Sequence, residues 1–94
     1  MKNVKNISVD QMIDNAGKPI ANQFIIRADN GRYFQSYSSI IAFISNDGEV
    51  TLDKNTWDYS KTTSKYRNLF LGEDTKTTQK KIDSGEYKLD DLNK

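Results

Sequence analysis

The sequence predicts an α+β fold, in which a small antiparallel β-sheet, a meander of about four strands, is covered by two C-terminal helices. Two turn signals, Asp29-Asn30-Gly31 and Ser45-Asn46-Asp47-Gly48, each lie between runs of β-branched and aromatic residues. Farther along, residues 57–83 have apolar side chains at helical spacing instead. At 94 residues the chain is expected to form a single domain, 1–94.

Residues 1–23 form a predicted N-terminal element with a short helix or a single helical turn. Ser8 is followed three residues later by Gln11, which is a capping-box pattern. The apolar residues that share one helical face are Val9, Met12 and Ile13. Pro19 is expected to stop any helix that begins here.

The predicted meander occupies residues 24–53. The segments FIIRA and RYFQSY flank the first turn signal and make a hairpin, and SSIIAFI and EVTLD flank the second. An antiparallel sheet of this kind packs one face against a core and can leave the other exposed to water. The apolar face therefore needs a cover, which we expect from residues 57–83.

The first predicted helix begins after Asp58 or Ser60 and runs through about Leu71. Gly72 can end it, because glycine adopts the left-handed conformation without steric cost. This helix contains most of the stretch WDYSKTTSKYRNLFLG, the segment densest in aromatic, hydroxyl and cationic residues.

The second predicted helix begins after Thr75 as its cap and runs through about Asp83. Residues 84–94 follow as a tail, in which EYKLDDL can form a short strand at an edge of the sheet.

Composition argues against catalysis. The chain has no histidine and no cysteine, so it lacks the usual proton-transfer group near neutral pH, thiolate nucleophiles and disulfides. The acidic pairs Glu73-Asp74 and Asp90-Asp91 have no histidine or glycine-rich loop beside them. We therefore expect a protein that is not an enzyme and has no cofactor and no metal. No apolar run has the length of a signal peptide or a membrane span, which predicts a soluble, unexported chain without a membrane partner.

The aromatic stretch allows two interpretations. In the first, Trp57, Tyr66, Leu69 and Phe70 fill the core between helix and sheet. In the second, the tyrosines are exposed anchors for a partner, because tyrosine is enriched at interfaces, and Arg67 stacks on an aromatic ring. The predicted partner-binding residues are Tyr37, Trp57, Tyr59, Tyr66 and Arg67. Whether this cluster is core or surface stays open at this point.

Charge supports an alternative function, nucleic-acid binding. Residues 54–81 carry seven cations and three anions, although the whole chain has a net charge of only +1. The candidate phosphate contacts, besides Arg67, are Lys61, Lys65, Lys76, Lys80 and Lys81. The match to a helix-turn-helix motif is poor, because Asn68 and Thr78 stand where small or aliphatic residues would pack the helix pair. Lys61 and Lys65 could equally steer the approach of a protein partner.

Three segments carry a resemblance to a known family: FQSYSSIIAFI, WDYSKTTSKYRNLFLGE and IDSGEYKLDDLN. Together they make the chain similar to a family of small proteins, with no settled activity, from phages, plasmids and other mobile elements of Gram-positive bacteria. The resemblance covers roughly residues 24–93 and leaves the stretch before Phe24 uncovered.

That resemblance implies a genetic context. It implies an accessory protein, located in the cytoplasm of the bacterial host, that binds a host protein. An inhibitor of a defence nuclease, of the anti-CRISPR or anti-restriction type, is the expected role. The chain can be a monomer or a homodimer, since an exposed edge strand such as Phe24–Ala28 could pair with a second copy.

Overall fold

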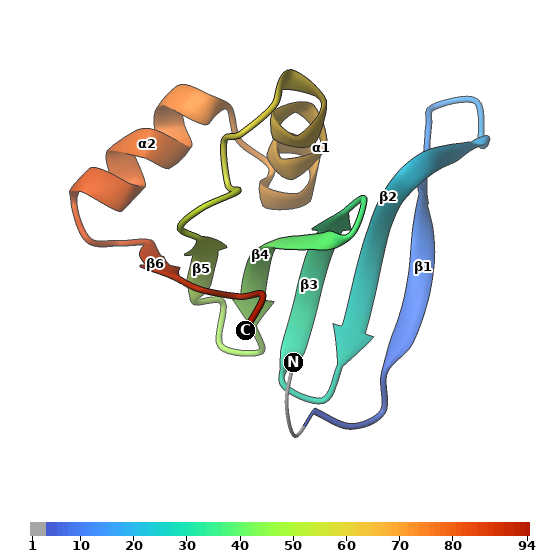
Figure 1. Cartoon of the computed structure of the whole chain (residues 1–94), viewed down its shortest axis with the longest axis horizontal. Coiled ribbons are helices and arrows are strands. Elements are labelled where there is room, and N and C mark those ends of the chain that lie inside the picture. Colours follow the sequence, from blue (N-terminus) through green and yellow to red (C-terminus); the bar gives the residue numbers. More distant parts are fainter. Residues whose placement is uncertain (1–3) are drawn as a thin grey trace.

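A computed structural model describes residues 4–94 and shows a six-stranded sheet with two helices lying over it (Figure 1). The strands are β1 (Ser8–Ile13), β2 (Pro19–Ala28), β3 (Gly31–Ser36), β4 (Ser39–Ser45), β5 (Val50–Asp53) and β6 (Lys88–Asp90). The helices are α1 (Lys61–Leu71) and α2 (Thr75–Asp83). The strands lie in the sheet in chain order, so the predicted α+β class and meander order are confirmed. The first three residues of the predicted element 1–23 lie outside the described residues.

The N-terminal element is a strand, so the prediction of a helix there is wrong. β1 pairs antiparallel with β2, from Ser8 opposite Arg27 to Ile13 opposite Pro19. The reversal between them is a turn in which Asp14 Oδ1 accepts the N–H groups of Ala16 and Lys18, each at 2.9 Å. Long-range pairing along β2 outweighs the local capping-box pattern, because a strand gains cross-strand packing that an isolated helical turn lacks.

This extra strand also changes which strands are edges. Phe24–Ala28 was expected to be an exposed edge, but β1 pairs with one side of it and β3 with the other. The edges of the sheet are β1 and β6.

The two predicted turns form as expected. Ala28 pairs with Gly31 across the first, and the Gly48 N–H donates to the Ser45 carbonyl, at 2.9 Å, in the second. β6 pairs parallel with β5, which confirms the predicted short edge strand.

Both helices have the caps that their sequences favour. Ser60 Oγ accepts the Thr63 N–H at 3.1 Å, and Gly72, with φ 74°, donates its N–H to the Asn68 carbonyl at 2.8 Å. The cap of α2 is Asp74, whose carboxylate accepts the Thr77 N–H at 2.8 Å. It was expected one residue later, at Thr75; the carboxylate also suits the positive end of the helix dipole.

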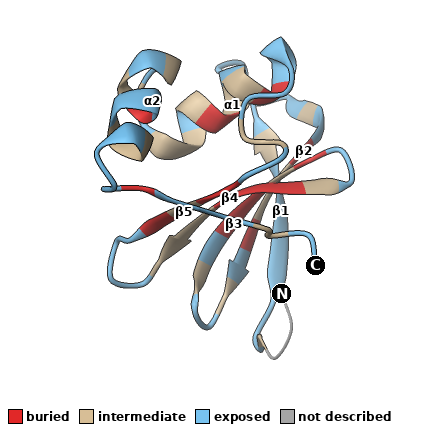
Figure 2. Cartoon of the chain, turned by 60° about the vertical axis from the view of Figure 1, so that its left-hand side comes forward, coloured by how far each residue is buried: buried red, intermediate tan, exposed pale blue. Residues whose placement is uncertain are grey.

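Apolar residues occupy both faces of the sheet. The buried residues of the face under the helices are Phe34, Ile41, Ala42, Val50, Leu52 and Tyr87. Figure 2 shows these buried positions concentrated on β3, β4 and β5 below the helical layer. The opposite face has a smaller cluster, with Leu92 of the C-terminal tail packed against it. The tail is held there because the Asn93 side chain bonds to the N–H (2.7 Å) and carbonyl (3.0 Å) of Ile40.

Candidate functional site

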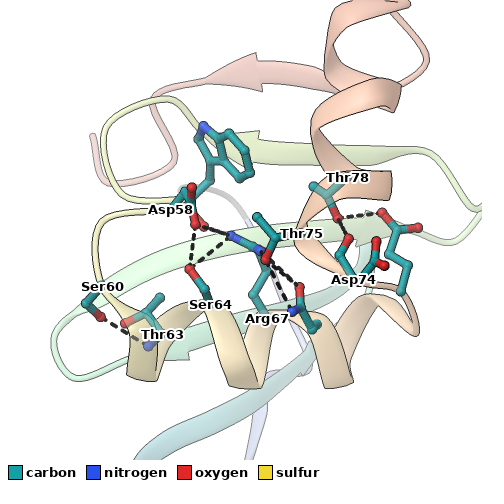
Figure 3. A network of polar contacts seen from close by, with 11 residues as sticks. Asp58, Ser60, Thr63, Ser64, Arg67, Asp74, Thr75 and Thr78 are labelled. Carbon is teal, nitrogen blue, oxygen red and sulfur yellow. Dashed lines mark hydrogen bonds and ion pairs between the residues drawn. The ribbon is translucent and has the colours of Figure 1, made fainter.

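The centre of the aromatic stretch is a buried arginine. Arg67 is 0% exposed and joins three segments through its guanidinium (Figure 3). Nη1 donates to the Trp57 carbonyl and to Asp58 Oδ1 at 3.3 Å, in the loop before α1. Nη2 donates to Asn68 Oδ1 at 2.9 Å and to Thr75 Oγ1 at 2.7 Å, at the start of α2. Arg67 therefore fixes the loop and both helices relative to one another.

The surroundings of Arg67 agree with one prediction and contradict another. Its guanidinium lies 5.1 Å from the centroid of the Trp57 ring, which is the predicted stacking on an aromatic face. The prediction that Arg67 is exposed is wrong, because its hydrogen-bond partners and the Trp57 ring enclose the side chain completely. Burial lowers the pKa of Arg67, and Asp58 opposes that change. Arg67 can shape a contact surface, but in this structure it does not reach a partner or a phosphate directly.

An open hollow lies over this network. Its volume is about 510 Å³. Its walls are formed by Asp58, Tyr59, Ser60, Lys61, Ser64, Lys65, Asn68 and Thr75. Ser64 Oγ donates to Asp58 Oδ1 at 2.7 Å, so the hydroxyl group of Ser64 holds this wall of the hollow in place. The exposed cations Lys61 and Lys65 and the half-exposed ring of Tyr59 surround the polar floor.

Two of the predicted anchors are well exposed. Tyr37 and Tyr59 each expose 51% of their surface. Both lie near the N-terminal end of α1: Tyr59 immediately precedes the cap residue, and the residue before Tyr37, Ser36, bonds to Thr63 of the first helical turn (Oγ to Oγ1, 2.9 Å). The two tyrosines, which are 22 positions apart in the sequence, therefore both lie near the same end of α1.

Tyr37 also has an unfavourable backbone. It is the first residue of the two-residue turn between β3 and β4, with φ 56°. Glycine is the usual residue at such a position, because a left-handed backbone costs other residues about 1–2 kcal/mol. Its N–H donates to the carbonyl of Asn22, at 2.7 Å, and Asn22 is left-handed as well, with φ 66°.

A second unfavourable feature lies next to this pair. Gln23 is 0% exposed, and neither its Oε1 nor its Nε2 has a hydrogen-bond partner among the described residues. A buried amide without partners costs about 1–3 kcal/mol. The backbone of Tyr37 and the buried amide of Gln23 are therefore two costly features close together beside the N-terminal end of α1, next to the left-handed Asn22. No feature of the sequence indicated this arrangement, since it arises from the pairing of β2 with β3.

The remaining aromatic residues of the aromatic stretch pack against the core, but Leu69 does not. Trp57, Tyr66 and Phe70 are partly buried and pack against the core under the helices, which is the expected core position. Phe70 also stacks on Phe34, with ring centroids 5.8 Å apart. Leu69 was expected in the same core but is 63% exposed, because it lies on the outer side of α1.

The cations of α2 differ in their surroundings. Lys76 and Lys80 are exposed, as a phosphate contact requires. Lys81 is instead paired with Glu73, Nζ to Oε1 at 2.9 Å, and lies 5.2 Å from the ring centroid of Tyr87. The hydrogen bonds that Lys81 donates to Glu73 and Tyr87 raise its pKa. Lys81 therefore has a role within the fold. It is less available for a phosphate contact than Lys61, Lys65, Lys76 and Lys80, which are exposed.

Glu73 is the acceptor at the centre of that pair. Its side chain is 9% exposed and accepts hydrogen bonds from Thr78 Oγ1 (2.6 Å), Lys81 Nζ (2.9 Å) and the Tyr87 hydroxyl (2.7 Å). Burial acts to raise the pKa of Glu73, but these three hydrogen bonds outweigh it and the pKa is lowered. The acidic pair Glu73-Asp74 is thus explained by structure: one residue ties α2 to the tail, and the other caps α2.

Two further findings concern the classes of site considered above. Among residues 4–94, no three or more metal-ligating side chains are placed to hold a metal ion. Neither of the two helices within residues 4–94 is long and apolar enough to cross a membrane.

Comparison with models of protein families gives a match. Residues 7–86 match a family of unknown function, DUF8033. No curated protein and no solved structure matches the chain. The matched region begins at residue 7, so most of the stretch before Phe24, which the resemblance left uncovered, lies within the family domain together with β1. Because the match covers most of the sequence, the chain belongs to the DUF8033 family.

Proposed function

We propose that this chain is a protein-binding accessory factor whose contact surface lies at the N-terminal end of α1. The contact surface consists of Tyr59, Lys61 and Lys65, which line the hollow described above, and of the exposed Tyr37, which follows Ser36 at the first turn of α1. Aromatic side chains supply most of the binding energy in protein interfaces, and lysines at the rim speed encounter.

The observation that supports this proposal best is the backbone of Tyr37. A tyrosine with φ 56° and 51% exposure adds little to the core, yet it occupies a position where glycine would cost less. Costly conformations collect at functional sites, where the surrounding structure maintains them. The buried, unpartnered amide of Gln23 is a further costly feature at the same place. In this proposal the ring of Tyr37 makes its contacts outside the chain.

Arg67 has a positioning role in this proposal. It holds Asp58, Asn68 and Thr75, three of the residues that line the hollow. A rigid wall lets Tyr59, Lys61 and Lys65 bind with little loss of side-chain entropy. Trp57 and Tyr66, which were predicted as anchors, contribute mainly through the core against which they pack.

The resemblance described above places such a factor on a phage or another mobile element. In that setting we propose an inhibitor of a host defence nuclease, of the anti-CRISPR or anti-restriction type, that acts by occlusion. Occlusion requires no catalytic group; it requires a rigid surface of about 800 Å² on each partner. A domain of this size can supply that area.

The test is capture from a lysate of a Gram-positive host, with the tagged chain as bait and with nuclease present or absent. A host protein captured equally under both conditions supports the proposal. Tyr59→Ala should reduce the capture while circular dichroism stays unchanged, because Tyr59 is half exposed. Tyr66→Ala is a less informative variant, since the partial burial of Tyr66 predicts a loss of stability.

A second candidate is nucleic-acid binding through Lys61, Lys65, Lys76 and Lys80. The observation in its favour is that all four cations are exposed on the two helices. Under this alternative, capture disappears with nuclease, affinity falls steeply with salt, and Lys80→Glu abolishes binding. Under the leading proposal, Lys80→Glu has little effect, because Lys80 lies outside the contact surface.

A further inference from the structure

The two edges of the sheet differ in how they resist pairing with another strand. β6 has only three residues, all exposed, and two of them are the charged Lys88 and Asp90. Short length and charge are features that protect an edge. β1 has six residues and contains neither lysine nor proline. Among residues 4–94, no strand pairs with the outer side of β1.

The one charge on β1 does not protect it. Asp10 is the only ionisable residue of the strand, and its Oδ2 lies 3.3 Å from Arg27 Nε on β2. The pair is exposed and contributes little stability, but it balances the charge that an approaching strand would meet. β1 is thus an open edge with a balanced charge.

Apolar side chains reach this open edge from the interior. On the face opposite the helices, buried Ile26 belongs to the smaller core cluster and lies directly opposite Val9. Val9 is 58% exposed, and Ile7, two residues earlier, is 49% exposed. The apolar strip on this face continues outward from β3 and β2 to β1, where it ends at the edge with its last members uncovered.

We propose that β1 pairs antiparallel with the β1 strand of a second copy of this chain, with the two-fold axis at Val9. In that register Val9 lies opposite Val9 of the second copy, so the two apolar strips become continuous. Ile7 lies opposite Gln11 of the second copy, and Ser8 lies opposite Asp10.

Charge disfavours one of the two neighbouring registers. A two-fold axis at Asp10 would place two carboxylates directly opposite each other, which destabilises a strand pair. With the axis at Val9, each Asp10 has Arg27 of its own chain on one side. On its other side, each Asp10 faces Ser8 of the second copy. Arg27 of the second copy pairs with that serine and lies one strand beyond it. The carboxylates and guanidinium groups are then complementary across the axis.

This pairing has a consequence for the contact surface. A two-fold axis perpendicular to the sheet leaves the helices of both copies on the same face. The dimer would present two contact surfaces toward the same side. The pairing itself does not depend on the proposed function, because it involves neither Tyr37 nor Tyr59.

The first part of the test is molar mass in solution. Sedimentation equilibrium of the wild-type chain over a dilution series should show the mass of two chains at the higher concentrations. Val9→Lys should shift the mass to that of one chain, while circular dichroism stays unchanged because the side chain is mostly exposed. The matched control is Leu89→Lys on β6, also exposed at 44%, which should leave the dimer intact.

The second part fixes the register. The chain has no cysteine, so Val9→Cys introduces a single thiol. Residues opposite each other in an antiparallel pair are close enough for a disulfide, and mild oxidation should link two Val9→Cys chains while Leu89→Cys chains stay unlinked. A wild-type chain that is monomeric throughout the series overturns the proposal. So does a dimer that survives Val9→Lys, or a Val9→Cys variant that fails to cross-link.

Discussion

The N–H of Tyr37 donates a hydrogen bond of 2.7 Å to the carbonyl of Asn22, and both residues have left-handed backbones. This bond joins the turn between β3 and β4 to the residue of β2 that precedes its pairing with β3, next to the first turn of α1. The structure maintains two uncommon conformations at one point, and an exposed tyrosine ring is the result.

Tyr37→Asn is expected to leave the fold intact. Asparagine tolerates a left-handed backbone better than tyrosine, and the exposed ring makes little contribution to the core. We therefore expect the free energy of unfolding, measured with urea, to stay within about 1 kcal/mol of the wild type. A loss well beyond that would mean that the ring supports the fold, and the strain argument for a binding role would fail.

Arg67→Lys is expected to destabilise the chain strongly. Lysine cannot replace the forked donors that reach Asp58, Asn68 and Thr75, and it leaves a buried charge with fewer partners. The expected cost is about 3 kcal/mol in urea unfolding. Lys65→Arg, on the exposed side of α1, is the control and should change stability by less than about 0.5 kcal/mol. Equal stability of the two variants would contradict the central role of Arg67.

Gly31→Ala should be far more costly than Gly48→Ala. A Cβ at Gly31 would overlap the carbonyl oxygen of Ile44 and lie 2.9 Å from Phe43 Cε1, so the β3–β4 ladder would have to move. At Gly48, with φ 87°, a Cβ meets nothing within 4 Å, and the cost is about 1 kcal/mol of backbone strain. We expect a difference of at least about 2 kcal/mol between the two variants in thermal or urea unfolding. Similar stabilities would show that the turn adjusts freely.

Glu73 should make stability depend on pH. Its pKa in the fold is below the ordinary value of 4.5, so its ionised form stabilises the fold. That contribution is fully present above the ordinary pKa and is lost as pH falls through the lowered one. Glu73→Gln should therefore cost about 1–3 kcal/mol at pH 7, and the difference from wild type should shrink in acid.

Glu86→Gln is the control for that series. Glu86 also lies near Lys81, at 3.9 Å, but its side chain is 61% exposed. Its replacement should change stability little at any pH. If both variants respond alike, the buried hydrogen bonds of Glu73 are not the cause.

The parts of the fold with local signals could be predicted from the sequence. The hairpin turns follow from Asp29-Asn30-Gly31 and Ser45–Gly48, and the end of α1 follows from Gly72, because these residues meet conformational requirements of their own. β1 could not be predicted securely, since Val9, Met12 and Ile13 suit a helix, whereas strand formation depends on pairing with distant residues. A usable signal was Asp14-Asn15-Ala16-Gly17, which resembles the turn at Gly31 and forms one.

The site was harder to predict than the fold. The core positions of Trp57 and Phe70 agree with the first interpretation of the aromatic stretch, and the exposure of Tyr59 agrees with the second. The burial of Arg67 could not be derived, because a charged residue is buried only when several partners from different segments converge on it. Those partners lie on both sides of it in the chain, up to ten residues away, in the loop before α1, in α1 itself and at the start of α2.

The central claim is that the ring of Tyr37 contacts a protein partner. The most direct measurement is quantitative capture of host proteins from a nuclease-treated lysate with wild-type and Tyr37→Asn bait of equal measured stability. A host protein that is enriched by the wild type and lost with Tyr37→Asn is the predicted result. Equal capture by both baits, or no protein enriched above an unrelated bait of similar size, would contradict the account.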